Sequence, residues 1–221
     1  MKIVLKEEEF FLTAEKALVH PATRTAFLAD LHLGKSTHFR KSGIATPAAI
    51  IHDEIVKLAF IIKKYNLQNL YFLGDLFHSH LNNEWSLFED FLEQHHTVNF
   101  ILVKGNHDIL PESLYNKNII TVVKEPYLFR SITLSHHPIA SAQLKKNSTL
   151  YNIAGHIHPG VVVRGKGRSA LKLPCYHQKE QQLILPAFGR FTGVVKQSGK
   201  TGDETFYAIV HEKVIAFNTN N

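Results

Sequence analysis

Five short polar segments each follow an apolar run of the sequence. They are Asp30-Leu31-His32, Gly74-Asp75-Leu76-Phe77-His78, Gly105-Asn106-His107-Asp108, Ser135-His136-His137-Pro138 and Gly155-His156-Ile157-His158-Pro159. Residues just beyond the strand ends line the ligand crevice of open α/β sheets, so we expect these segments to converge on one site. Their aspartate, asparagine and histidine side chains are oxygen and nitrogen ligands. Such ligands suit manganese, iron or zinc, and they disfavour copper(I) and iron–sulfur clusters.

The spacing within two of these segments predicts how their side chains are directed. In Asp30-x-His32 and His156-x-His158, alternate residues place both side chains on one side of an extended backbone. The glycines that precede Asp75, Asn106 and His156 allow the tight turns that direct the next residue into the crevice.

Strands and helices alternate in the first half of the chain. Strands are expected at residues 9–13, 17–20, 25–29, 69–73 and 98–103. One helix is expected within residues 43–66, with Thr46 as its N-cap and Pro47 at its first position. A second helix is expected at residues 82–96. This order favours an α/β fold with a parallel or mixed sheet.

From residue 119 onward the patterns predict strands alone. They are expected at residues 119–123, 127–129, 132–135, 151–154, 161–163, 183–185 and 207–210. We find neither an internal repeat nor a low-complexity segment.

The composition is that of a folded globular protein, with 44% hydrophobic and 20% charged residues. A chain of 221 residues without a recognisable linker predicts one domain, residues 1–221. Cys175 is the one cysteine, which excludes an intramolecular disulfide and a cysteine-based zinc site. The sequence predicts no membrane span, and charges near residue 6 disfavour a signal peptide, so we expect a cytoplasmic protein.

The net charge of +6 indicates an anionic partner. Residues 126–179 contain eight basic residues and no acidic one, and this stretch includes two of the five polar segments. Some of these cations are expected near the crevice, and a solvated basic surface is the alternative. The eight are Arg130, Lys145, Lys146, Arg164, Lys166, Arg168, Lys172 and Lys179.

The polar segments have the patterns D-x-H, G-D-x-x-(D/H), G-N-H-(D/E), S-H-x-P and G-H-x-H, in that order along the chain. This ordered set resembles the calcineurin-like metallophosphoesterase superfamily. The resemblance implies a four-layer α-β-β-α sandwich of two mixed sheets and a binuclear metal-dependent phosphoesterase. Residues 29–40, Leu185-Pro186-Ala187-Phe188-Gly189 and Phe191-Thr192-Gly193 further resemble the bacterial ligase-associated DNA damage response endonucleases, the PdeM-like subfamily.

The resemblance also implies a role for each site residue. One metal is held by Asp30, His32 and His158, the other by Asn106, His136 and His156, and Asp75 bridges the two. The metals are two divalent cations, with Mn²⁺ expected and Fe or Zn as alternatives. A hydroxide that also bridges the metals attacks the phosphate ester. His107 acts as the general acid for the leaving oxygen or stabilises the transferring phosphoryl group.

One position departs from the family pattern. Many relatives have an aspartate as the fifth residue of the second segment, where it orients the catalytic histidine, and this chain has His78. Asp108 is a candidate for that orienting role. His137 follows a predicted ligand but occupies a variable position.

The subfamily resemblance implies a DNA phosphodiesterase or endonuclease in DNA repair, associated functionally with a DNA ligase and a helicase. Two alternatives remain open. One is a phosphatase or phosphodiesterase that acts on a small molecule. The other is a metal-binding scaffold without turnover.

Overall fold

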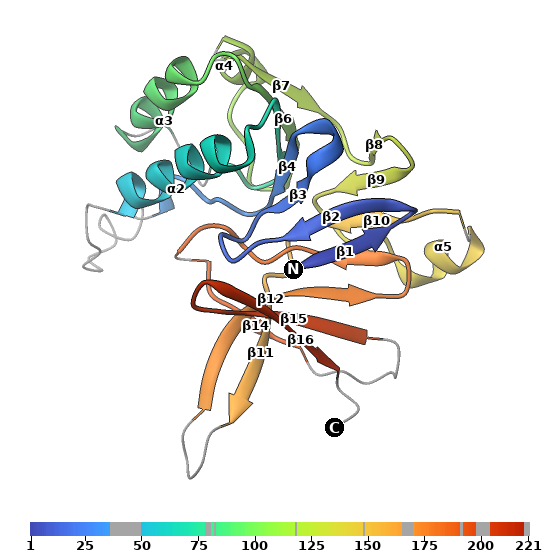
Figure 1. Cartoon of the computed structure of the whole chain (residues 1–221). Helices are drawn as coiled ribbons and strands as arrows, with labels where there is room; N and C mark the ends of the chain where they lie inside the picture. Colours follow the sequence, from blue (N-terminus) through green and yellow to red (C-terminus); the bar gives the residue numbers. More distant parts are fainter. Residues whose placement is uncertain are drawn as a thin grey trace.

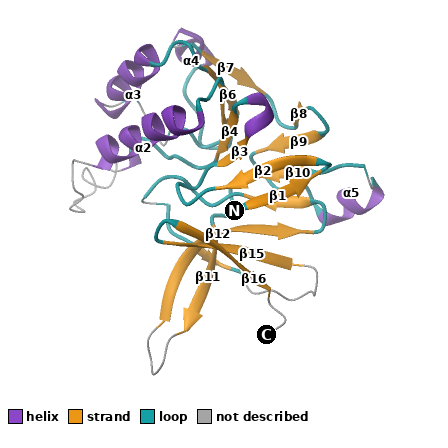
Figure 2. Cartoon of the chain, in the orientation of Figure 1, coloured by secondary structure: helices purple, strands orange, loops and turns teal. Residues whose placement is uncertain are grey.

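Two β-sheets lie face to face, and helices cover the outer face of the first sheet (Figures 1 and 2). The computed structural model describes the chain except for residues 36–49, 78–80, 82, 118, 148, 165–169, 191, 198–203 and 219–221. The expected α/β sandwich of two mixed sheets is confirmed. In the described part of the chain, the helical layer beside the second sheet consists of α5 (Ser141–Lys146) alone.

The first sheet has seven strands in the order β1-β2-β3-β4-β5-β6-β7. They are β1 (Lys2–Leu5), β2 (Glu8–Leu12), β3 (Leu18–His20), β4 (Thr25–Leu28), β5 (Asn69–Leu73), β6 (Asn99–Val103) and β7 (Ile120–Val123), with the 3-10 turn η1 (Pro21–Thr23) between β3 and β4. The strands from β4 to β7 are parallel, and the others pair antiparallel. The covering helices are α2 (Ile50–Tyr65), α3 (Asn83–Gln94) and α4 (Glu112–Lys117).

The second sheet has nine strands, and its central order is β14-β11-β12-β13-β10-β9-β8. The strands β15 and β16 extend it from β12. The strands are β8 (Tyr127–Phe129), β9 (Ile132–Ser135), β10 (Asn152–Ala154), β11 (Pro159–Arg164), β12 (Ala170–Lys179), β13 (Gln182–Ile184), β14 (Val195–Lys196), β15 (Glu204–Val210) and β16 (Lys213–Asn218). Here β9, β10 and β13 run parallel to one another.

Two apolar clusters hold these layers together. The first lies between the helices and the first sheet, where Leu58 and Ile61 of α2 pack with Leu28 and Phe72. The second fills the space between the two sheets. Because β4 contributes to both clusters, all four of its residues are buried, as expected for a central parallel strand.

The expectation of strands alone after residue 119 is wrong, because α5 lies there. Its six residues include one buried side chain, Leu144, so helical periodicity is not visible in the sequence. The strand β12 was also missed. Residues 170–172 are exposed, and Pro174 is a residue usually absent from central strands. The expected N-terminal residues of the first helix, Thr46 and Pro47, lie outside the described residues.

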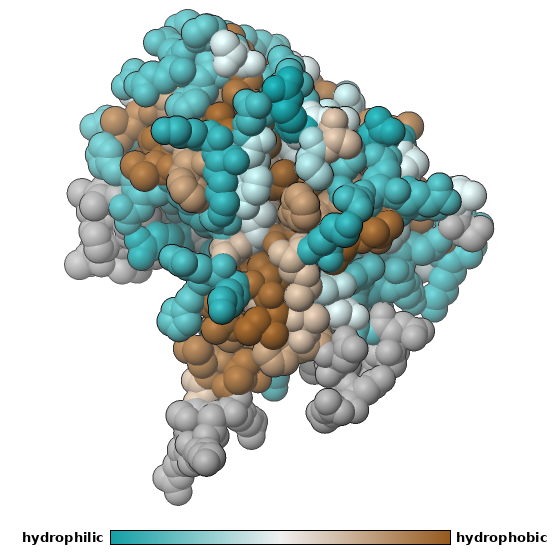
Figure 3. All heavy atoms as spheres, viewed as in Figure 1, coloured by the Kyte–Doolittle hydropathy of each residue, from teal (hydrophilic) through white to brown (hydrophobic). Residues whose placement is uncertain are grey.

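Apolar side chains also appear on the surface of the second sheet. Figure 3 shows a hydrophobic surface over the region of β11, β15 and β16. Exposed members of these strands are Val163, Ile215 and Phe217. None of the helices in the described part of the chain is long and apolar enough to cross a membrane.

Candidate metal centre

All five polar segments lie at the carboxyl ends of parallel strands. Three follow β4, β5 and β6 of the first sheet, and two follow β9 and β10 of the second. The carboxyl ends of parallel strands meet at one edge of a sheet, and the two sheets present these edges side by side. The structure therefore brings side chains from residue 30 to residue 158 into one cluster.

One group of side chains comprises Asp30, His32 and His158, whose ligand atoms all lie within 4.8 Å of one another. The Oδ1 atom of Asp30 is 3.4 Å from Nε2 of His158. The Nδ1 atom of His158 lies 2.9 Å from the carbonyl of Thr192, to which it donates a hydrogen bond. This bond fixes the tautomer and leaves Nε2 available as a ligand atom. Burial opposes protonation of His158, but Asp30 raises its pKa overall.

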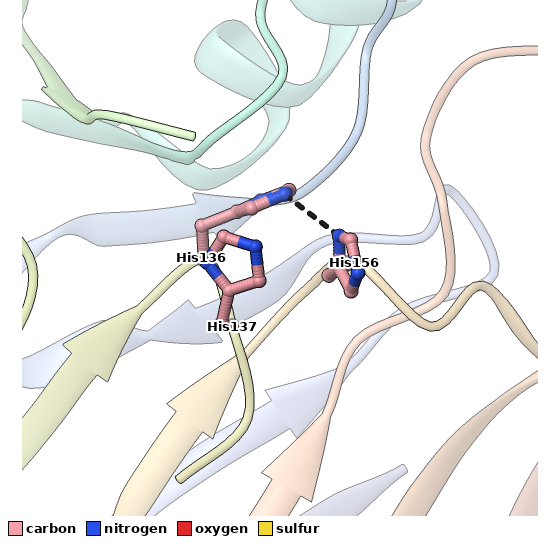
Figure 4. Close-up of side chains that lie close together, drawn as sticks. All are labelled: His136, His137 and His156. Atoms are coloured by element: carbon pink, nitrogen blue, oxygen red, sulfur yellow. Dashed lines mark hydrogen bonds between the residues drawn. The ribbon is translucent and has the colours of Figure 1, made fainter. Parts of the chain in front are cut away.

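A second group forms around His136, whose side chain is fully buried. Its Nδ1 atom donates to the carbonyl of Leu73 at 3.0 Å, so Nε2 is the atom directed at the site. That Nε2 atom is 3.0 Å from Oδ1 of Asn106 and 3.1 Å from Nδ1 of His156. Figure 4 shows a ring nitrogen of His136 directed at a ring nitrogen of His156, with His137 beside them. Burial lowers the pKa of His156, and His136 and His137 lower it further.

Asp75 lies between the two groups. Its Oδ1 atom is 3.5 Å from Nε2 of His136, and its Oδ2 atom is 3.7 Å from Nε2 of His32. The two carboxylate oxygens are thus directed at different groups, as a bridging ligand requires. Only 2% of the Asp75 surface is exposed.

These atoms are suited to binding divalent cations. Ligands bound at about 2.1 Å and at right angles are about 3.0 Å apart, close to the spacing of the three atoms around His136. Within the described residues, the buried Oδ1 atom of Asp30 accepts no hydrogen bond. Because an unpaired buried carboxylate oxygen is costly, a cation is its natural partner. The mixed donor set of carboxylate, imidazole and amide suits a transition metal such as manganese, iron or zinc.

The backbone at the site is not extended, which corrects the alternation argument. Five of the expected ligands have a positive φ: Asp30 (55°), His32 (51°), Asp75 (52°), His156 (70°) and His158 (51°). Non-glycine residues seldom adopt this left-handed conformation, and such strain is concentrated at functional sites. The paired side chains therefore meet because the backbone turns sharply at each ligand, and not because alternate residues share a strand face.

Asp108, the candidate for orienting His107, binds the backbone of two site loops. Its buried carboxylate accepts hydrogen bonds from backbone N–H groups. These groups belong to Asp75, Leu76 and Gly105, each at 2.8 Å, and to Phe77 at 3.4 Å. Burial raises the pKa of Asp108 to about 6, although these donors favour its ionised form. Asp108 thus positions the loop that carries Asp75. His78 lies outside the described residues.

His107 sits at the rim of the cluster. Its backbone N–H donates to Oδ1 of Asp75 at 2.9 Å, and its exposed ring lies 5.8 Å from the ring of His32, centroid to centroid. It is therefore near the expected metals while remaining open to solvent. His137 lies within ligand distance of His136 and His156, and Glu125 binds its Nδ1 at 2.7 Å.

Comparison with known proteins assigns the chain to a family. The model of the calcineurin-like phosphoesterase family matches residues 23–173. The chain is a calcineurin-like phosphoesterase. Among solved structures, this phosphoesterase is similar to the Pseudomonas putida nuclease MPE, at 28% identity and a TM-score of 0.78 over 98% of this chain and 99% of that one. The expectation of a metal-dependent phosphoesterase is thereby confirmed.

Other matches are weaker. Yfce, a phosphoesterase from E. coli, is 14% identical with a TM-score of 0.39, over 89% of this chain and 99% of that one. A comparison of the phosphoesterase with curated proteins finds no match.

Three of the eight basic residues of the 126–179 stretch pair with glutamates away from the metal centre of the phosphoesterase. Arg130 pairs with Glu8, Lys145 with Glu180, and Lys179 with Glu204. The side chains of the remaining glycine-rich turn, at residues 164–168, lie outside the described part. Lys35 does lie close to the metal centre. Burial lowers the pKa of Lys35, and the charges of Asp75 and Asp30 oppose this shift.

Gly74 allows the close packing of the phosphoesterase site, and its replacement is expected to damage it. Its φ is +75°, and an added Cβ would lie 2.3 Å from Nδ1 of His136. We expect Gly74→Ala to displace the imidazole and weaken metal binding about 10- to 100-fold, as changes to groups that orient ligands do. Metal titration of the purified variant measures this effect.

Gly193→Ala is the matched control for this prediction. Gly193 has a similar φ of +68°, but an added Cβ meets no atom of the described residues within 4 Å. It shares the backbone strain without the clash, so its metal affinity should stay within about threefold of wild type. Equal losses in both variants would show that backbone strain, and not contact with His136, causes the effect.

Proposed function

We propose that this phosphoesterase is a binuclear, Mn²⁺-dependent nuclease that hydrolyses DNA phosphodiester bonds. The observation that carries the proposal is the position of Asp75, whose two oxygens are directed at separate groups of ligands. The similarity to a nuclease over almost the whole of both chains supports the choice of substrate. The roles expected for Asp30, His32, Asn106, His136, His156 and His158 are part of this proposal.

The residues of the chain would contribute as follows. Bound divalent cations would supply a nucleophile at neutral pH and neutralise charge on the phosphate. Asp75 and Asp30 hold two negative charges in a buried place and so define where cations bind. His107 is held against Asp75 through its backbone N–H, and its ring would donate a proton to the leaving oxygen.

A substrate panel tests the proposal. With Mn²⁺ added, the full chain should hydrolyse a chromogenic phosphodiester and cleave DNA, and it should act much more slowly on a phosphomonoester. Turnover of the monoester alone would favour a small-molecule phosphatase. If the protein binds two metals but hydrolyses none of the three substrates, the result would favour a metal-binding scaffold without catalytic activity.

Replacement of His107 separates acid catalysis from metal binding. We expect His107→Ala to retain both metals while its rate falls roughly 10²- to 10⁴-fold. The fall should shrink for substrates with a good leaving group, because these need little protonation. Rates for a series of aryl phosphodiesters, together with metal content, provide the measurement. An equal loss across the series would assign His107 a purely electrostatic role.

The wider biological setting is also part of the proposal. The PdeM-like sequence features suggest action in DNA repair in the cytoplasm, with a functional link to a DNA ligase and a helicase. Deletion of the gene should then sensitise cells to DNA damage, and an unchanged survival curve would argue against the repair role.

A further inference from the structure

A pocket of about 330 Å³ lies between helix α2 and the segment that follows β13. Three cationic side chains line it: Lys16, Lys57 and Arg190. The ring of Phe188 forms an apolar part of its wall. In Figure 1, α2 (cyan) lies above the loops that carry Lys16 (blue) and Phe188 (orange). None of these residues belongs to the metal centre.

The pocket is nevertheless close to the metal centre. The backbone N–H of Phe188 donates to the carbonyl of Ala29 at 2.8 Å, and that of Gly189 donates to the carbonyl of Asp30 at 3.2 Å. A smaller cavity of about 80 Å³ shares Lys16 and Arg190 with the pocket and is also lined by His158. The cationic pocket therefore adjoins two of the expected ligands.

Neither lysine forms an ion pair with a carboxylate among the described residues. In the described part of the chain, Lys57 forms no ion pair, and its Nζ atom lies 3.9 Å above the centre of the Phe188 ring. Burial and the charge of Lys16 together lower its pKa to about 7. The Nζ atom of Lys16 donates to the carbonyl of Ala187 at 2.8 Å, and burial lowers its pKa to about 8. Neither contact supplies a full negative charge.

The acidic residues of the pocket both contact Arg190. Oε1 of Glu54 accepts a hydrogen bond from the backbone N–H of Arg190 at 2.9 Å, and Oδ2 of Asp53 pairs with its guanidinium group at 2.6 Å. Burial raises the pKa of Glu54 to about 7, so it is only partly ionised at neutral pH. The pocket is thus lined by three cationic and two acidic side chains, so positive charge is in excess.

We propose that this pocket binds a phosphate group of the substrate strand, next to the phosphodiester that the metals attack, with Lys57 and Lys16 as its main contacts. A bound phosphate supplies the missing counter-charge and holds both ammonium groups protonated. The volume exceeds that of a phosphate alone and admits part of the attached sugar, for which Phe188 provides an apolar contact. This inference rests on the proposed nuclease function and locates a second point of contact with the strand.

Replacement of Lys57 by methionine tests the site kinetically, because methionine keeps the packing on Phe188 and loses the charge. For an oligonucleotide, Lys57→Met should raise KM about tenfold or more, the loss expected for a hydrogen bond to a charged group. Its kcat should stay within about twofold, and hydrolysis of a small chromogenic diester should not change, because that substrate does not reach the pocket. Lys63→Met, on the exposed side of the same helix, should leave all three values unchanged.

Substitution of the substrate identifies the phosphate. A series of oligonucleotides carries one neutral methylphosphonate linkage at successive positions along the strand. At one position beside the scissile bond, this linkage should weaken binding to the wild type. The same linkage should not weaken binding to Lys57→Met further, since the contact is already lost. Additive losses at every linkage, or an unchanged KM for Lys57→Met, would overturn the proposal. The proposal would also be overturned if Lys57→Met weakened the binding of inorganic phosphate but left the binding of oligonucleotides unchanged.

A failure of the nuclease function itself would look different. In that case the wild type would hydrolyse the small diester but cleave no DNA. Fluorescence anisotropy of a labelled oligonucleotide, measured with the full chain in the presence of chelator, then gives the binding affinity in the absence of turnover. This affinity tests whether the pocket binds the strand. A lower affinity of Lys57→Met than of Lys63→Met supports strand binding, and equal affinities overturn it.

Discussion

Asp75→Asn is expected to abolish phosphoesterase activity while leaving the fold intact. The Asn side chain keeps the shape of Asp75 and can still accept the hydrogen bond from the N–H of His107. It removes the negative charge directed at both ligand groups, so at least one of the two metals should be lost. Metal analysis and the rate of diester hydrolysis measure the two effects. Two retained metals with wild-type turnover would contradict the bridging role.

The same variant has a second, opposite effect on stability. Without metals, the buried carboxylates of Asp75 and Asp30 repel each other, since they occupy one small cluster. Asp75→Asn removes that repulsion, so the metal-free variant should unfold at the same temperature as the metal-free wild type or a higher one. Asp90→Asn on the exposed face of α3 is the control and should change neither activity nor stability.

Asp108→Asn is expected to have the largest effect on stability. Each carboxylate oxygen of Asp108 accepts from two backbone N–H groups. An amide has one oxygen and one NH₂ group, so two buried N–H donors would face another donor. Each unpaired donor costs about 1–3 kcal/mol, which predicts a loss of roughly 2–5 kcal/mol in the free energy of unfolding.

Chemical denaturation of the metal-free protein measures this loss, and metal content and activity should fall with it because the loop carrying Asp75 is released. Asp90→Asn again serves as the control for loss of a carboxylate. A stability within 0.5 kcal/mol of wild type, about the usual range for surface substitutions, would contradict the positioning role of Asp108.

The convergence of the polar segments could be predicted, because residues after parallel strands must meet at one edge of a sheet. This placed Asp75 and His136 together although they are far apart in the sequence. The left-handed backbone at Asp30 and His158 could not be predicted, since their side chains would group in either geometry. The role of Asp108 was missed because its partners are backbone groups, which no residue pattern records.

The cationic pocket was missed for a different reason. Lys16 and Lys57 lie in segments that read as an ordinary turn and an ordinary amphipathic helix. Their shared position in one pocket becomes visible only when α2 packs beside the segment that carries Phe188. By contrast, the basic stretch at residues 126–179 was conspicuous in the sequence, yet three of its members are paired with glutamates away from the site.

The cluster draws ligands from both sheets, with Asp30 and Asp75 following strands of one and His136 and His156 following strands of the other. Neither sheet alone can assemble it, so tight metal capture should come late in folding, after the sheets have docked. In the folded protein, bound cations would link the two sheets across their interface. Partial denaturation that separates the two sheets should release metal before either sheet unfolds. Metal release would therefore report whether the interface between the sheets is intact.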